Sequence, residues 1–159
     1  MDPKRALVVE SEPEAQAMIR TEIERMGFVV ETAVRYEDVL EALFVRTPGL
    51  VVLSLSLPCN SGYDVCEVLR AEARFADVQI LVTSDRATPS EMAWAEDAGA
   101  NAFLKKPFTV AQLTKYVFAL TDPRWPSRPS VRRLRCSEVP LSHVSRDGGI
   151  LGARRDCFS

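Results

Sequence analysis

Along the first 120 residues, short apolar runs alternate with segments in which apolar residues recur every three or four positions. The central run covers residues 50–57, between Pro48-Gly49 and Pro58, and is too short for a membrane span or a long helix. A mostly apolar run of this length is typical of a strand buried on both faces, as in parallel sheets covered by helices. In such sheets the functional groups lie at the carboxyl ends of the strands, and Ser54 lies near that end.

Four further runs predict strands over residues 6–9, 28–32, 78–83 and 102–104. Between these predicted strands, apolar residues recur at the spacing of a helix face. The predicted apolar faces are Ile19, Ile23 and Met26; Val39, Leu40, Leu43 and Phe44; Val65, Val68 and Leu69; and Leu113, Tyr116, Val117 and Leu120. Strand and helix alternate five times, which predicts a doubly wound, five-stranded parallel α/β sheet with right-handed crossovers.

Several helix ends carry capping signals. Ser11 or Glu12 is positioned to cap the first helix. The run Thr88-Pro89-Ser90-Glu91 has the form of a capping box, in which the threonine and glutamate side chains bond to each other's backbone N–H groups. Thr109 is expected to cap the last helix.

The charge is divided unevenly along the 159 residues. Residues 1–120 hold 12 Lys and Arg against 18 Asp and Glu, a net of −6, whereas residues 121–159 hold 8 against 4, a net of +4. The composition also shifts toward proline and arginine from Thr121. We therefore expect one domain over residues 1–120, a Pro/Arg-rich linker over 121–133, and a basic tail over 134–159 that forms a small β-hairpin or is disordered.

The cysteine and histidine content bears on metal sites and on the compartment. The 4 cysteines form no Cys-x-x-Cys pair and His143 is the only histidine, so the usual spacing of a structural zinc site is missing. A reduced, cytoplasmic setting is expected. We also expect no export signal and no membrane helix, because residues 1–5 lead directly into a short apolar run.

A set of residues in a fixed order resembles the receiver domain of the response regulators of bacterial two-component systems. The markers are Glu10 after the first strand, Leu57-Pro58 with Gly62, Thr83, Ala98-Gly99-Ala100, Phe103, and Lys106-Pro107-Phe108. The resemblance covers roughly residues 4–120 and implies the flavodoxin-like receiver fold. It also implies phosphorelay signal transduction, in which an aspartate of the central strand accepts a phosphoryl group.

Carried over by position, the resemblance places Glu10 and Ser11 on the acidic metal-binding pair, Ser54 on the phosphoacceptor, Thr83 on the phosphate-binding hydroxyl, Phe103 on the switch aromatic and Lys106 on the phosphate-binding lysine. Of the three carboxylates in that pattern, only Glu10 is present. One carboxylate with two neutral hydroxyls is a poor ligand set for Mg²⁺, so we expect no metal and no cofactor. Because serine forms no acyl phosphate, we expect a degenerate pocket without catalytic residues, in which Ser54 is a structural hydroxyl.

Two interpretations stay open for the retained residues. Lys106 is either a remnant phosphate clamp or the partner of Glu10 in a partly exposed ion pair worth about 0–1 kcal/mol. Thr83 and Phe103 either switch as they do in the family or serve as strand-end and core residues.

Trp94 lies on the predicted fourth helix, between Met92 and Ala95, which suit the buried side. Receivers commonly use the fourth helix, fifth strand and fifth helix for partners or dimers, so an exposed Trp94 would anchor a protein partner or a homodimer. A partly buried Trp94 is the alternative.

The tail has a faint resemblance to the start of a PilZ domain, which binds cyclic diguanylate. Arg128 and Arg132 match the spacing of its arginine segment, with Arg133 beside them, and residues 143–148 match its loop with histidine in place of aspartate. The two parts are too close together and too short to close a barrel, so the PilZ-like segment is incomplete. A disordered basic tail is the alternative, and DNA binding is not expected because no helix-turn-helix pattern is visible.

Together these features predict a pseudo-receiver that acts in signalling through protein contacts and is not an enzyme. A second interpretation is a phosphorylation-independent effector whose basic tail binds cyclic diguanylate or another nucleotide. A third, a phosphoacceptor at some other residue, is disfavoured by Ser54.

Overall fold

The computed structural model describes residues 4–57 and 61–121. Five parallel strands form one sheet in the order β2-β1-β3-β4-β5. Their bounds are β1 Lys4–Val9, β2 Phe28–Ala33, β3 Leu50–Ser54, β4 Gln79–Ser84 and β5 Ala102–Lys105. The predicted doubly wound, five-stranded parallel α/β sheet is confirmed for these residues.

The helices are α1 Pro13–Arg25, α2 Tyr36–Val45, α3 Ser61–Ala71, α4 Pro89–Asp97 and α5 Val110–Thr121, with a short 3₁₀ turn, η2, at Ala73–Phe75. Among residues 4–57 and 61–121, no helix has the length and apolar character needed to cross a bilayer. The predicted linker and tail lie outside the described residues.

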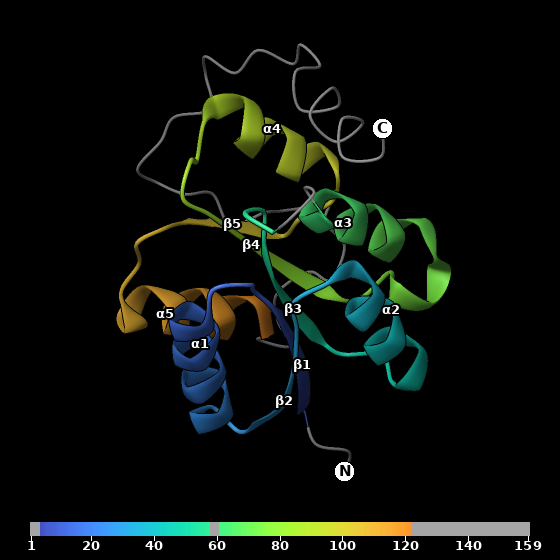
Figure 1. The fold of residues 1–159 in the computed structure, drawn as a ribbon, viewed down its shortest axis with the longest axis horizontal. Coiled ribbons are helices and arrows are strands. Elements are labelled where there is room, and N and C mark those ends of the chain that lie inside the picture. Colours follow the sequence, from blue (N-terminus) through green and yellow to red (C-terminus); the bar gives the residue numbers. More distant parts are fainter. Residues whose placement is uncertain (1–3, 58–60, 122–159) are drawn as a thin grey trace.

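Two apolar layers cover the two faces of the sheet, with α1 and α5 on one face and α2, α3 and α4 on the other (Figure 1). The strand β3 alternates its side chains between the layers: Leu50 and Val52 join the α1/α5 layer, while Val51 and Leu53 join the opposite one. All five residues of β3 are buried, as expected for a central strand of a parallel sheet.

One helix face differs from the pattern expected from its spacing. On α2, Val39 and Leu43 are buried as predicted, but the Phe44 side chain is 78% exposed. The helix α2 packs against the edge strand β2 and against α3, and this packing leaves Phe44 uncovered. The stripe of buried residues on α2 is therefore narrower than the spacing of its apolar residues predicts.

The capping signals divide into confirmed and corrected cases. Glu12 is the N-cap of α1 but makes no side-chain cap bond. Thr109 caps α5, because its side-chain hydroxyl accepts a hydrogen bond from the Gln112 N–H at 3.1 Å. The Gln112 side-chain oxygen in turn accepts a hydrogen bond from the Thr109 N–H. At α4, Thr88 accepts from the Glu91 N–H at 3.2 Å, whereas the Glu91 carboxylate accepts a bond from outside the predicted box, from Ser84.

Candidate functional site

Parallel topology brings the carboxyl ends of four strands to one edge of the sheet, where the sequence places its candidate residues. Glu10 directly follows β1, Ser54 ends β3, Thr83 is the penultimate residue of β4, and Lys106 directly follows β5. Ser54 and Thr83 are register partners on neighbouring strands, so their side chains project from the same face. The Lys106–Pro107 peptide bond that leaves this edge is cis.

The Lys106 ammonium lies between Glu10 and Ser54. Its Nζ is 2.5 Å from Glu10 Oε2 and donates a second hydrogen bond to Ser54 Oγ at 3.2 Å. The side chains are 14% and 2% exposed for Lys106 and Glu10. The expected ion pair is therefore formed, but it is more buried than the partly exposed pair predicted from the sequence.

Glu10 and Ser54 accept further hydrogen bonds from backbone N–H groups. Glu10 Oε1 accepts the Glu12 N–H at 3.1 Å, so both carboxylate oxygens have donors. Ser54 Oγ accepts the Ser56 N–H at 3.2 Å in addition to the lysine. Ser54 is 1% exposed, so its hydroxyl is a buried acceptor within a bonded network.

Thr83 is the unsatisfied member of the group. Its side chain is fully buried, and its Oγ1 has no hydrogen-bond partner among the described residues. A buried hydroxyl without a partner costs about 1–3 kcal/mol. Phe103, the predicted switch aromatic, is 5% exposed and belongs to the apolar layer beneath α2, α3 and α4.

Gly62 explains how α3 approaches this edge so closely. A Cβ atom at residue 62 would come within 2.5 Å of the Ser54 backbone carbonyl oxygen. A side chain here would force α3 away from the end of β3, which is the physical reason for glycine at this marker position.

A cavity of about 620 Å³ opens beside the buried pair. Sequence reasoning missed two of its polar residues, Ser56 and Asp85, whose side chains are joined by a hydrogen bond of 2.9 Å from Ser56 Oγ to Asp85 Oδ1. The signal was available, because each follows a predicted site residue by two positions. The cavity is lined by Glu10, Ser11, Glu12, Glu14, Ala15, Met18, Ser56, Asp85, Lys106, Pro107 and Phe108.

Mg²⁺ is the cation that a receiver implies, and the residues present do not fit it. Ser11 and Ser54 are neutral, and Glu10, the one carboxylate at the three family positions, is already bonded to Lys106. Within the described part of the chain, no group of three or more His, Cys, Asp and Glu side chains is placed to hold a metal ion. Mg²⁺ demands octahedral oxygen coordination and is usually bound through one or two carboxylates together with waters, whereas the family positions here offer one carboxylate that is paired with Lys106.

Trp94 is half-buried on α4 and packs against Tyr63 of α3. The two rings meet edge to face with centroids 4.3 Å apart and an interplanar angle of 69°. Met92 and Ala95 are buried, as their spacing predicts. Part of the Trp94 ring is thus used inside the domain and part remains available at the surface.

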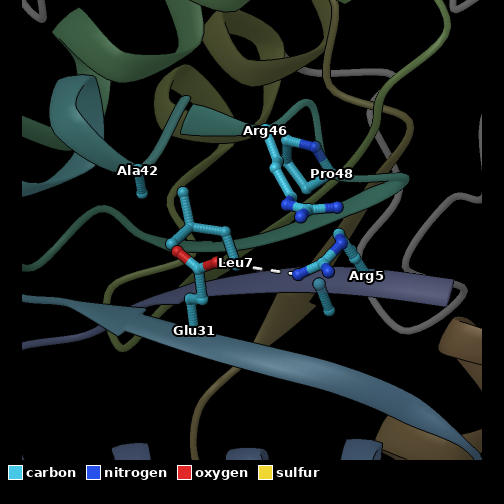
Figure 2. Close-up of a pocket in the computed structure, with 7 residues that line it drawn as sticks. Arg5, Leu7, Glu31, Ala42, Arg46 and Pro48 are labelled. Carbon is cyan, nitrogen blue, oxygen red and sulfur yellow. Dashed lines mark ion pairs between the residues drawn. The ribbon is translucent and has the colours of Figure 1, made fainter. Parts of the chain in front are cut away.

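A second, much smaller pocket lies between β1, β2 and the end of α2 (Figure 2). Arg5 and Glu31 form an ion pair of 3.9 Å at its wall, and Arg46 and Pro48 also line it. Its volume of about 10 Å³ is close to that of a single water molecule. This pocket is too small for a nucleotide.

The tail residues Arg128, Arg132 and Arg133 lie outside the described residues.

A family model for the response regulator receiver domain matches residues 6–118. The chain belongs to this family. PhoB, the phosphate regulon transcriptional regulatory protein of Rhizobium meliloti, is 32% identical over 141 residues, covering 89% of this chain and 61% of PhoB. Response regulator MprA of Mycobacterium sp. (strain KMS) is 31% identical over 146 residues, covering 91% of this chain and 63% of MprA. The chain therefore spans less than two thirds of the length of either relative.

Solved receivers share the fold. Chemotaxis response regulator CheY4 of Vibrio cholerae superposes with a TM-score of 0.69 at 19% identity, covering 75% of this chain and 99% of CheY4. Response regulator DrrB of Thermotoga maritima superposes with a TM-score of 0.65 at 22% identity, covering 72% of this chain and 51% of DrrB. Residues 4–121 thus contain a receiver domain of the kind used in two-component signalling.

Proposed function

We propose that this protein is a pseudo-receiver, which acts in signalling through protein contacts without aspartyl phosphorylation and without an enzymatic activity of its own. The observation that carries the proposal is the buried network at the phosphoacceptor position, where Ser54 replaces the carboxylate and Lys106 is bonded to Glu10. A cytoplasmic location, where two-component partners reside, is part of the same proposal.

The chemistry of Ser54 supports this reading. Acyl phosphate formation requires a carboxylate oxygen as nucleophile, and a serine ester would be a different and far less labile product. The Ser54 hydroxyl is also 1% exposed, so an incoming phosphodonor would have to displace the lysine above it.

The hydrogen bonds of the Lys106 ammonium also support the proposal. In a working receiver a lysine at this position is a donor to phosphoryl oxygens, whereas here its ammonium donates to the Glu10 carboxylate and the Ser54 hydroxyl. A phosphoryl group would therefore compete with a buried carboxylate for the same ammonium.

We place the partner surface on α4, β5 and α5, with the exposed part of Trp94 as an anchor. A half-buried tryptophan held by Tyr63 has a fixed orientation, which reduces the entropy lost on binding. The occupant of this surface is a protein, and a second copy of the chain is one form that the proposal allows.

Phosphodonor labelling tests the proposed chemistry. We expect the full chain, incubated with acetyl phosphate and Mg²⁺, to show no mass increase of a phosphoryl group, because neither an aspartate acceptor nor the metal ligands are present. The matched variant Ser11→Asp/Ser54→Asp restores the carboxylates and shows whether the fold still admits a donor. A stoichiometric phosphoryl label on the wild-type chain, either an acyl phosphate that both acid and base remove or a serine phosphate that survives acid, would contradict the proposal.

A second candidate function is favoured by the opposite charge of the two parts of the sequence. In this reading the basic tail, including Arg128, Arg132 and Arg133, binds cyclic diguanylate or another nucleotide in a PilZ-like manner. Calorimetry with cyclic diguanylate should then show binding that weakens with salt and disappears in an Arg128→Ala/Arg132→Ala/Arg133→Ala variant of the full chain. No heat at high micromolar ligand would exclude this function.

A further inference from the structure

The connection between β4 and α4 is closed by a hydrogen bond that is separate from the Glu10–Lys106 pair. Ser84, the last residue of β4, donates from Oγ to Glu91 Oε1 in the first turn of α4 at 2.5 Å. The same Oγ accepts the Arg86 N–H at 3.2 Å. Ser84 is fully buried and Glu91 is 2% exposed, so this contact lies inside the domain.

Arg86 supplies a positive charge close to the buried carboxylate. Its Nε is 3.6 Å from Glu91 Oε2, although the arginine side chain is 63% exposed. A carboxylate buried without hydrogen bonds or a counter-charge is strongly unfavourable, so Ser84 and Arg86 together account for its position. The Thr88 hydroxyl accepts the Glu91 N–H and fixes the start of the helix.

The loop between these residues is in a conformation that needs external support. Ala87 has φ +44° and is 7% exposed. A non-glycine residue in the left-handed region persists where the surrounding contacts hold it there. The Ser84 and Glu91 contacts lie on either side of Ala87 and provide that constraint.

The same cluster reaches the aromatic pair on the α3 and α4 surface. Tyr63 is buried, and its burial and the nearby Glu91 charge raise its pKa to about 12, against the opposing effects of the charge and hydrogen bond of Arg86. Tyr63 in turn packs edge to face on Trp94. The charges of Glu91 and Arg86 therefore act on Tyr63, which packs on Trp94, and Trp94 lies on the same helix as Glu91.

We propose that Ser84, Glu91 and Arg86 form a latch that holds the β4–α4 loop and the Tyr63–Trp94 pair in one conformation, so that the partner surface is preset. The bonds of the latch join Ser84, Glu91 and Arg86 to one another, whereas Ser84 meets Lys106 through the backbone, where its carbonyl oxygen accepts the Lys106 N–H at 2.8 Å. Glu91 acts as a positioning residue. This inference rests on the proposed function, because it supplies the reason why the surface needs no phosphoryl signal.

Hydrogen exchange and tryptophan quenching on the full chain test the latch. Trp125→Phe serves as background, so that Trp94 is the only tryptophan. In that background Ser84→Ala should speed amide exchange over residues 85–95 by about tenfold and raise acrylamide quenching of Trp94 about twofold, with exchange in β1 and α1 unchanged. The matched control is Ser90→Ala, which removes a hydroxyl from the same helix outside the latch.

Equal exchange and quenching in Ser84→Ala and Ser90→Ala would overturn the latch. If Ser84→Ala fails to fold, Glu91→Gln replaces it, because glutamine keeps an acceptor for Ser84 but loses the attraction to Arg86. Glu91→Gln should give the same local increase in exchange, and an unchanged pattern would again overturn the proposal. These readouts need no phosphodonor and no partner, so they fail or succeed independently of the labelling experiment.

Discussion

At Ser54 the replacement of a carboxylate by a hydroxyl changes what its neighbours do. With an aspartate, this edge would carry an additional negative charge next to Glu10, and a bound cation would be needed to offset it. With serine, the Lys106 ammonium offsets the Glu10 carboxylate, whose side chain is 2% exposed while that of the lysine is 14% exposed. The charges of the Glu10–Lys106 pair thus offset each other without a bound cation.

Because Glu10 is buried, loss of its partner Lys106 should destabilise the fold by more than the roughly 0–1 kcal/mol expected for an exposed ion pair. Lys106→Met should lower the free energy of unfolding by about 2–4 kcal/mol, because it leaves Glu10 buried without its cation. The matched control Lys105→Met, at the neighbouring exposed position, should change it by no more than about 0.5 kcal/mol. Urea unfolding monitored by circular dichroism gives both values.

A double-mutant cycle then separates the pair from its surroundings. Glu10→Gln/Lys106→Met should recover much of the stability lost in Lys106→Met, because no buried charge remains. Simple additivity of the two single changes would show that the two side chains do not act as a pair.

Among the secondary-structure elements, α3 is fixed by one arginine to the segments that lead into β4 and β5. Arg70 donates to the backbone carbonyls of Gly99 at 3.0 Å, Val78 at 2.8 Å and Phe75 at 3.2 Å, and to the Asn101 side chain at 2.8 Å. Gly99 has φ +99°, and its position against the arginine stem leaves no room for a Cβ. A single guanidinium thereby joins α3, η2, β4 and β5.

Arg70→Met should therefore be costly although it keeps much of the apolar stem. Several acceptors would lose their donor together, and we expect a loss of about 2–4 kcal/mol of unfolding free energy. Arg20→Met, which breaks an exposed pair with Glu24, should cost no more than about 0.5 kcal/mol. Denaturant unfolding of the two variants side by side decides the matter, and equal midpoints would refute the structural role of Arg70.

At the scale of the whole molecule, some features follow from the sequence and others do not. Hydrophobic period predicts the alternation of strands and helices because burial sets that period, and parallel strands necessarily bring Glu10 and Lys106 to one edge. How deeply that pair is buried depends on packing across the whole pocket. The exposure of Phe44 likewise depends on which neighbour α2 meets, a fact absent from the local spacing.

The Ser84–Glu91 bond shows where local pattern and tertiary contact compete. A capping box assigns the Glu91 carboxylate to the backbone of Thr88, but in the folded chain this carboxylate accepts a hydrogen bond from the buried Ser84 hydroxyl. The outcome depends on the path of the loop through Ala87, which the sequence pattern does not specify.

Beryllofluoride titration followed by nuclear magnetic resonance tests the central claim most directly, because this phosphoryl mimic binds aspartate acceptors with Mg²⁺. With the full chain we predict unchanged amide shifts at Ser54, Thr83 and along α4, while Ser11→Asp/Ser54→Asp serves as the variant with restored ligands. Saturable shifts at Ser54 that spread to Thr83 and Trp94 in the wild-type chain would contradict a pocket that is closed to phosphoryl chemistry and a surface that is preset.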